Sequence, residues 1–476
     1  MKKSMFAVLL VVSMVVVACA PAPATQAPAT EAPAVTEAPA ATEAPAATEA
    51  PAATEAPAAA EQVEVIWYVR SNAIEQAWEN GVIPAFEAAH PNIKINLVVV
   101  PWADFDTKMQ TMIAAGTPPD VWSHWGPSGY GDYVRRGLVA NLTPLIERDK
   151  YDLSDFFPSV LNVFKVEDKV MGLPILITGS YIFYNRDLFD AAGVKYPPTN
   201  WDDTSWTWDA FVEKCKALTK DTDDPAKVVF GCSMSAISYQ YPWLWGQPMY
   251  PDEAATTGFA EKAYMDTPGS IAGFQARQDL VWKLHYMPDP AQTDAMGGSE
   301  IFQTGKVAML LTGGFDWWAY NGMNLHEKFK WGVAALPYAD PGRKDVTFAD
   351  PWMMSSKTAH PDEAWEFMKY LASYEVQENW MTETGCSPVR KSLEERWYGL
   401  FPSMTPEEVR EVYQGSLKYG VESYDNLMMR ADRIAQVISS GLDPVYNNDA
   451  TAADALPDLN KQLEQTLKEI KAEYAK

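Results

Sequence analysis

The stretch VEVIWYVRSNAIEQAWENGVIPAFEAAHPNIKINLVVVPW, residues 63–102, decides the fold class of this chain. Residues 63–70 form an apolar run rich in β-branched and aromatic side chains, which predicts a buried strand. Residues 73–92 have helical periodicity and end at the turn HPN, and residues 93–102 predict a second strand. This order of elements is typical of an α/β lobe whose strands pair in parallel.

The same alternation continues along the chain. Residues 104–120 predict a helix that is stopped by Gly116 and a pair of prolines, and VWSHW, residues 121–125, predicts a third strand and its end. Ligands of parallel sheets bind beyond the carboxyl ends of the strands. We therefore expect Tyr68 to Asn72 and Ser123 to Ser128 to lie at the mouth of a binding site.

The first residues predict export rather than structure. Lys2 and Lys3 precede an apolar run from Met5 to Ala18, which is too short to span a bilayer as a mature helix. Residues 1–18 are therefore interpreted as a signal peptide. The sequence VVAC, ending at Cys19, is similar to a bacterial lipobox, in which the cysteine becomes the first mature residue and carries a lipid. An ordinary cleavage site is the alternative.

A low-complexity segment favours the lipoprotein interpretation. Residues 19–61 begin with the candidate lipid site and continue as a low-complexity segment with repeats of TEAPAA. Alanine, proline, threonine and glutamate cannot bury a core, so this segment is expected to be disordered. Regular proline biases it toward polyproline II, a semi-rigid spacer of about 3.1 Å per residue. We expect it to hold the folded part off the membrane surface.

Composition limits the partners of the folded part. The net charge of −25 argues against nucleic acid and against an anionic membrane surface as partners. Residues 62–476 are long enough for two domains, and 18 Trp and 22 Tyr supply rings for a core or a pocket. The spacing of Cys and His predicts no metal site, and no cofactor is expected. Cys215 and Cys232 are compatible with a disulfide and with two buried thiols.

A succession of short motifs resembles one known family. The stretches are GTPPDVW, GLPILITGSYIFYNRDLF, FQTGKVAMLLTGGFDWW, WGVAALP, SSKTAHPDEAWEFMKYLAS and TGCSPVR, spread over roughly residues 63–390. Their order resembles that of the family 1 extracellular solute-binding proteins of ABC importers, of the maltodextrin-binding and multiple-sugar-binding type. The resemblance implies an α/β, two-lobe periplasmic-binding-protein-like (type II) fold, with hinge crossovers and an interlobe cleft that closes on its ligand.

The lobes of this family are discontinuous in sequence. Carried over to this chain, lobe one would comprise residues 62–175 plus 343–385, and lobe two would comprise residues 176–342 plus 386–476. Hinge strands would lie near Pro174 to Thr178 and near Leu336 to Gly342.

Candidate ligand contacts follow from the chemistry of sugars, whose faces stack on aromatic rings and whose hydroxyl groups bond to polar side chains. They are Tyr68, Arg70, His124, Trp125, Tyr184, Trp243, Trp245, Asp316, Trp317, Trp318, Trp352 and Arg390, with Asp350 beside Trp352. The motif GGFDWW, residues 313–318, is the strongest candidate, because its glycines allow close approach of a ligand.

Three of these residues also have a structural interpretation. Arg70 is also compatible with a surface charge, His124 with a buried structural histidine, and Tyr184 with hinge packing. The tryptophans at 201, 206 and 208 are interpreted as structural residues of lobe two.

The resemblance implies a monomeric substrate-binding lipoprotein with no catalytic residues. It would capture a carbohydrate and deliver it to ABC permease subunits, while the Cys19 lipid holds it on the outer face of the cytoplasmic membrane. A secreted carbohydrate-active enzyme is one alternative, which would need two carboxylates across a cleft. A structural or adhesion protein is another. A glycerophosphodiester ligand would favour several arginines, and only Arg70 and Arg390 are in place.

Overall fold

A computed structural model of the chain describes residues 62–70, 73–101, 104–123, 129–220, 227–235, 240–317 and 324–475. The predicted signal peptide, the Cys19 lipid site and the spacer lie outside these residues. Within the described ranges, no helix is long and apolar enough to cross a membrane.

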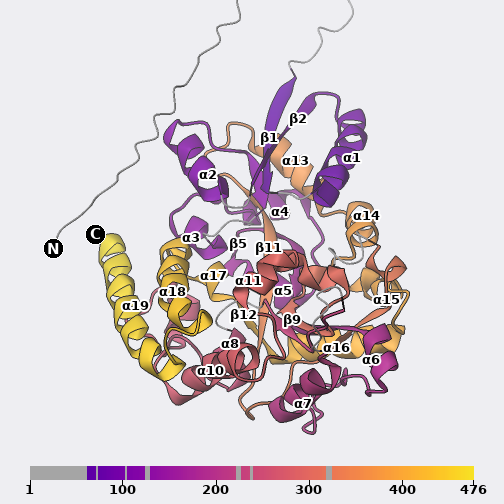
Figure 1. Cartoon of the computed structure of the whole chain (residues 1–476). Helices are drawn as coiled ribbons and strands as arrows, with labels where there is room; N and C mark the ends of the chain where they lie inside the picture. The colour runs from indigo at the N-terminus through magenta and orange to yellow at the C-terminus, as the bar shows by residue number, and fades with distance from the viewer. Residues whose placement is uncertain are drawn as a thin grey trace, which may run out of the picture. The chain divides into compact units, whose positions relative to one another are not determined.

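The first sheet has the α/β core that residues 63–102 predict. Strand β1 (Val63–Arg70) pairs in parallel with β2 (Ile93–Val100) and with β3 (Val121–Ser123). The connecting helix α1 (Ala73–Ala89) packs against β2 (Figure 1). The predicted bounds of the first strand and the parallel pairing are confirmed.

One long strand joins this sheet to later parts of the chain. The strand order is β12-β11-β3-β1-β2, and β6 also pairs with β11. Strand β11 (Asp345–Met354) runs parallel to β12 (Gly420–Glu422) and antiparallel to β6 (Leu173–Thr178) and β3. Segments far apart in sequence therefore meet along β11.

The second sheet has the order β10-β7-β9-β8. Its central strand β7 (Ser180–Asn185) is buried along its whole length and pairs antiparallel with β9 (Met309–Gly313) and β10 (Trp331–Ala334). Strand β8 (Ser233–Met234) pairs in parallel with β9. Strands β4 (Lys165–Val166) and β5 (Lys169–Val170) form a separate hairpin.

Helices surround both sheets (Figure 1). Those whose buried residues pack with the first sheet are α2 (Phe105–Ala114), α3 (Tyr130–Arg135), α5 (Pro158–Val163), α13 (Pro361–Leu371) and α14 (Tyr374–Thr384), and α4 (Thr143–Asp149) lies in the same part of the chain. The others are α6 (Arg186–Ala192), α7 (Trp208–Leu218), α8 (Gln240–Leu244), α9 (Glu253–Thr257), α10 (Pro268–Trp282), α11 (Pro290–Ala295), α15 (Glu394–Tyr398), α16 (Pro406–Tyr419), α17 (Tyr424–Leu427), α18 (Ala431–Tyr446) and α19 (Ala452–Tyr474). Short 3₁₀ segments span Gly298–Thr304, Leu325–Glu327 and Lys391–Leu393.

Two hydrophobic cores divide these elements into two lobes. One core contains Val65 and the first sheet, and the other contains Phe183 and the second sheet. We call them lobe one and lobe two. Core membership changes between Ile177 and Tyr181, between Val346 and Ala349, and a third time between Val389 and Leu393, and we propose the lobe boundaries at these positions.

We therefore propose a second boundary that follows the segment near Leu336 to Gly342, where the resemblance implies a hinge strand. Leu336, in the expected hinge segment, is fully buried in the core of lobe two. The strand that crosses between the cores is β11, because its first residues pack in lobe two and its last residues pack in lobe one.

The first two crossings are tied together by a buried carboxyl. The Asp345 side chain accepts a hydrogen bond from the backbone N–H of Ser180 at 2.9 Å and another from the Ser416 hydroxyl. Burial raises the pKa of Asp345 well above its usual range. Gly179 is required beside this joint, because a Cβ atom there would lie 1.8 Å from the Ser416 hydroxyl oxygen.

The tryptophans before α7 are structural. The Trp201 indole donates to the Val412 carbonyl at 2.8 Å, and the Trp206 indole donates to the Ala335 carbonyl at 2.9 Å. Both rings are buried in the core of lobe two, as the sequence predicts. At the helix start, the Thr207 side chain accepts from the Ala210 N–H and caps α7.

The cysteines in the described part of the chain are free and buried. Of the two interpretations that the sequence allows, the structure has Cys215 and Cys232 as free, buried thiols. Burial, with the neighbouring Cys232 thiol, raises the pKa of Cys215 well above its ordinary value.

Candidate functional site

A group of polar side chains gathers where β1 ends. Arg70 is the last residue of β1, and Glu75 lies in the first turn of α1, which follows. The Arg70 Nη1 atom is 3.4 Å from the Glu75 Oε2 atom. This position, beyond the carboxyl end of a parallel strand, is where the sheet rule places ligand-binding groups.

Asp350, in the middle of the crossing strand β11, belongs to the same group. Its residue is only 8% exposed, and its carboxyl makes no hydrogen bond to any residue that the structure describes. Burial raises the pKa of Asp350 to about 7, the nearby Arg70 charge lowers it, and the Glu75 charge adds to the rise. Phe348 and Asp350 are two residues apart in β11, so their side chains lie on the same face of the strand.

Strand β12 contributes a further carboxyl. The Glu422 Oε1 atom accepts from the Ala349 N–H at 3.2 Å and from the Asn426 side chain at 2.6 Å. The Oε2 atom is buried and has no hydrogen-bond partner among the described residues. Burial raises the pKa of Glu422 to about 8 against these hydrogen bonds, and the Asp350 charge adds to the rise.

Helix α3 of lobe one adds a buried hydroxyl. Tyr130 is 3% exposed, and its hydroxyl has no hydrogen-bond partner within the described part of the chain. Burial raises the pKa of Tyr130 above its ordinary value, Arg135 opposes this, and the Glu422 charge adds to it. We call Arg70, Glu75, Tyr130, Asp350 and Glu422 the junction cluster.

A pair of aromatic rings lies next to the crossing strand. The ring centroids of Phe315 and Phe348 are 5.8 Å apart at an interplanar angle of 71°, and both residues are half-buried. Phe315 follows Gly313 and Gly314 in the turn after β9. Gly314 is needed there, because a Cβ atom would lie 1.9 Å from the Thr178 hydroxyl oxygen. This turn thus packs closely against the first crossing.

The chemistry of the junction cluster suits a small polar molecule. A buried polar group without a partner is destabilising by about 1–3 kcal/mol, so such groups in a native protein need an explanation. A ligand that brings hydroxyl or N–H groups would satisfy Asp350, Glu422 and Tyr130 together. The neighbouring rings would cover its apolar face.

Three other suggested residues pack in the core of lobe one. The Tyr68 hydroxyl donates to the Phe105 carbonyl at 2.7 Å, and the Trp352 ring lies 5.6 Å from the Trp67 ring. The Arg390 guanidinium donates to the Ala372 carbonyl and is 3.1 Å from the Asp155 carboxylate. Internal contacts account for these positions.

The residues suggested in lobe two also have internal partners. Trp317 has no exposed surface and packs against Trp397 and Phe401, with ring centroids 5.2 and 4.6 Å away. Tyr184 is 1% exposed and packs against Phe189 at 5.3 Å.

The tryptophans of α8 and the loop after it also contact lobe two. The Trp245 ring is 5.1 Å from the Trp208 ring, and the Trp243 carbonyl accepts from the Lys344 N–H at 3.0 Å. Asp316 is half-buried beside Phe315. His124, Trp125 and Trp318 lie outside the described residues.

Of the suggested residues, the structure brings Arg70 and Asp350 together. Sequence reasoning missed Glu75, Tyr130 and Glu422. Glu75 has an ordinary local explanation, since an acidic residue is favourable in the first turn of a helix. Glu422 is distant in sequence from Arg70, and no local pattern signals its role.

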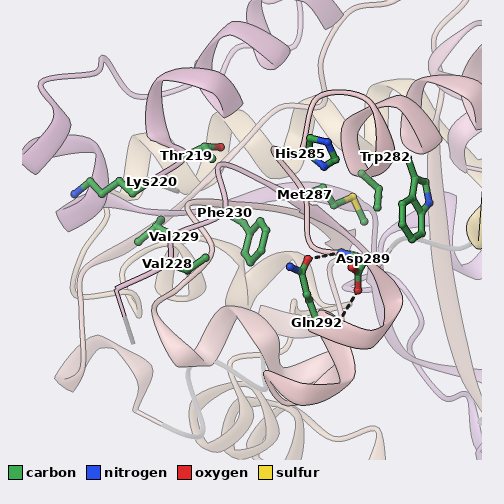
Figure 2. Close-up of a pocket in the computed structure, with 11 residues that line it drawn as sticks. Thr219, Lys220, Val228, Val229, Phe230, Trp282, His285, Met287, Asp289 and Gln292 are labelled. Atoms are coloured by element: carbon green, nitrogen blue, oxygen red, sulfur yellow. Dashed lines mark hydrogen bonds between the residues drawn. The ribbon is translucent and has the colours of Figure 1, made fainter. Parts of the chain in front are cut away.

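A separate cavity of about 430 Å³ lies in lobe two, and Figure 2 shows its lining. Asp289 and Gln292 bond to each other there, with the Gln292 N–H donating to Asp289 at 2.7 Å and the Asp289 N–H donating to the Gln292 side chain at 3.0 Å. These bonds form a capping box at the start of α11. No group of His, Cys, Asp and Glu within the described ranges is arranged to hold a metal ion.

Comparison with known proteins gives this geometry its context. A binding protein of Brucella abortus (strain 2308) is 28% identical over 315 residues, which cover 64% of this chain and 71% of that protein. The multiple sugar-binding protein of Streptococcus mutans is 25% identical over 325 residues, covering 65% of this chain and 70% of that protein.

Solved structures share the two-lobe fold. An ABC substrate-binding protein from Listeria monocytogenes, in complex with cycloalternan, superposes with a TM-score of 0.72 at 24% identity, covering 86% of this chain and 99% of that one. A maltose-bound protein of T. maritima gives a TM-score of 0.67 at 20% identity, covering 85% and 100%. The α/β periplasmic-binding-protein fold expected from the sequence is confirmed.

The family model for bacterial extracellular solute-binding proteins matches residues 71–378, which include both sheets except β1 and β12. That range contains the crossing strand β11 and most of the junction cluster. This chain belongs to the bacterial extracellular solute-binding protein family.

Proposed function

We propose that this chain is the carbohydrate-binding component of an ABC importer. The observation that carries the proposal is the junction cluster, in which Tyr130, Asp350 and Glu422 bring together polar atoms that have no hydrogen-bond partner among the described residues. A sugar would supply hydroxyl groups to these side chains and an apolar face to Phe315 and Phe348. The name of the Streptococcus mutans relative and the ligands in the titles of the solved structures support a sugar.

Capture would proceed by a shift between open and closed forms. A ligand that contacts both lobes at once binds the closed form better and therefore increases its population. The crossing strand β11 can transmit this movement, because it is hydrogen-bonded to β3 and β6 on one side of the crossing and to β12 on the other. The closed protein would then dock on permease subunits and release the sugar to them.

The location follows from the family and from the first residues. Extracellular solute-binding proteins act in the periplasm or at the cell surface. We propose that residues 1–18 direct export and that Cys19 carries the lipid anchor, with residues 19–61 as a spacer. We further propose that the protein acts as a monomer and performs no catalysis.

The ligand class is tested by thermal unfolding of the full chain against mono- and oligosaccharides, glycerophosphodiesters and amino acids. A solute that binds only the folded form raises the melting temperature by mass action. We expect a shift of several degrees with one class of sugar and no product in the mixture. Asp350→Asn should reduce the shift, whereas Asp168→Asn, an exposed change of the same chemistry in the β4–β5 turn, should not.

The alternatives give different results. A shift with another solute class and none with sugars would keep the binding function and reject the carbohydrate. Conversion of a sugar to product would instead support an enzyme, and would direct attention to the carboxylates of the junction cluster.

A further inference from the structure

We propose that the ligand held at the lobe junction carries a protonated amine, as in an amino sugar or an amino-substituted polyol. This inference rests on the carbohydrate-binding function proposed above and adds the charge of the ligand. It derives from the imbalance between acidic and basic groups in the junction cluster.

Acidic groups outnumber basic ones in this cluster. Glu75, Asp350 and Glu422 come from α1, β11 and β12, and the facing cation is Arg70, which lies 3.4 Å from Glu75. The buried thiol of Cys386 also lies close to Asp350 and adds no positive charge.

A second cation, Arg135, lies near Tyr130, and its guanidinium is hydrogen-bonded to residues outside the junction cluster. Its guanidinium donates to the Leu427 carbonyl at 2.8 Å and to the Thr256 carbonyl at 3.0 Å. The internal segments that the structure does not describe contain one side chain that can become cationic, His124. Residues 71–72, 102–103, 124–128, 221–226, 236–239 and 318–323 contain no Lys or Arg.

Two carboxyl groups of the cluster also keep oxygen atoms that accept no hydrogen bond from the described residues. The Asp350 carboxyl makes no hydrogen bond within the described residues although it is only 8% exposed, and Glu422 keeps one buried oxygen without a partner there. A buried carboxylate without a hydrogen-bond donor is poorly stabilised by its surroundings. An ammonium group placed between Asp350 and Glu422 would form charge-assisted hydrogen bonds to both.

The protonation of the cluster agrees with this picture. Burial raises the pKa of Asp350 to about 7 and that of Glu422 to about 8, so both hold protons over part of the neutral range. A cationic ligand favours their ionised forms and would displace those protons. A neutral sugar would leave them in place, and an anionic ligand would favour the protonated forms further.

Isothermal titration calorimetry on the full chain tests the ligand charge. The probes are matched sugars of the same length and linkage that differ in one group: glucose, N-acetylglucosamine and glucosamine, with their β-1,4-linked and α-1,4-linked oligomers. We expect the free-amine form to bind at least about tenfold more tightly than the hydroxyl and N-acetyl forms near neutral pH, since one unit of pKa change corresponds to about a factor of ten.

A second readout needs no substitution. Repeating the titration in buffers of different ionisation enthalpy counts the protons exchanged on binding. We expect proton release with the amine and none with the neutral sugar. Affinity for the amine should rise as the pH rises through 7 and toward 8, until the amine itself loses its proton.

Variants then locate the effect. Asp350→Asn and Glu422→Gln should each lower the ratio of amine to hydroxyl affinity toward one, whereas the exposed control Asp168→Asn should leave the ratio unchanged. If a variant fails to fold, the proton count on the unmodified chain still decides.

Each result separates the two proposals. Equal or tighter binding of the neutral or an anionic sugar would overturn the amine inference and leave the carbohydrate function standing. If none of these sugars nor any other sugar binds, the carbohydrate function fails and the amine inference fails with it.

Discussion

The backbone N–H of Ser180 donates to the Asp345 Oδ1 atom at 2.9 Å and so joins the first residues of β7 and β11 at the lobe crossing. Both residues are fully buried. The bond fixes the two crossing segments to each other at the point where the cores separate.

Replacing Asp345 by alanine should therefore destabilise the whole protein. The change leaves the Ser180 N–H buried without an acceptor and removes the partner of the Ser416 hydroxyl. We expect a loss of about 1–3 kcal/mol in the free energy of unfolding for each buried group left unpaired. Urea unfolding measures it, with Asp168→Ala as an exposed control; equal midpoints for the two variants would contradict the role of the joint.

Two glycines should respond in opposite directions to the same substitution. Gly314→Ala would place a Cβ atom 2.8 Å from the Gly179 carbonyl oxygen, which is backbone and cannot move aside easily. Gly81 lies inside α1, and an added methyl group there would have no other atom within 4 Å, so Gly81→Ala should stabilise by about 0.5–1 kcal/mol. Thermal unfolding of both variants checks this. An unchanged melting temperature for Gly314→Ala would show that the backbone at the first crossing can shift to make room for the methyl group.

The ligand-free protein should lose stability as the pH rises through neutrality because of Asp350 and Glu422. Their pKa values are raised from 3.8 to about 7 and from 4.5 to about 8 on folding, so the native state binds more protons than the unfolded state between these limits. Stability contributed by these groups then falls as the pH increases.

Neutral replacements should flatten this dependence. We expect Asp350→Asn and Glu422→Gln to raise the unfolding midpoint more at about pH 8 than at about pH 5, because amides cannot ionise. Differential scanning calorimetry over this range provides the measurement. Parallel pH curves for the variants and the unmodified chain would show that neither carboxyl is titrating.

Arg135 and Arg136 provide a matched pair for testing the contact between lobes. Arg135 donates to the carbonyls of Leu427 and Thr256, whereas Arg136 bonds to Asp132 and Gln110 within lobe one. Arg135→Ala should shift the ligand-free protein toward open forms, seen as a larger radius of gyration in solution scattering. Arg136→Ala should leave the radius unchanged, and an equal change in both would reject the assignment.

Trp317 should behave as a core residue. Its ring has no exposed surface and contacts Trp397 and Phe401. Trp317→Ala is expected to lower the free energy of unfolding by about 3–5 kcal/mol, and Trp245→Ala, which removes a half-buried ring, should lower it less. Denaturant unfolding of both compares them; a small loss at Trp317 combined with weaker ligand binding would restore its role as a ligand contact.

The sequence predicts best where local pattern and tertiary structure agree. The strand at 63–70 has the expected bounds, because the residue pattern that predicts a strand is a local property. In the sequence, Trp317 resembles a ligand contact because it follows a glycine pair that is typical of a binding turn. Whether such a ring faces a ligand or a core depends on helices such as α15, which lie much later in the chain.

The junction cluster is only partly predictable for the same reason. Arg70 follows a strand end and can be found from that rule alone. Glu422 reaches the cluster because β12 returns to pair with β11, and Tyr130 because α3 packs beside α17. Nothing near these residues in the sequence marks them as neighbours of Arg70.

Strand β11 has a consequence for the way the lobes move. Because one unbroken strand is hydrogen-bonded within both lobes, opening cannot proceed by separating that strand from its partners. We therefore expect the lobes to turn by twisting this strand where it passes between the two cores, between Val346 and Ala349. Asp350 lies directly after that segment, at a shift in the pairing register, so the proposed ligand contact and the twisting segment are neighbours on one strand.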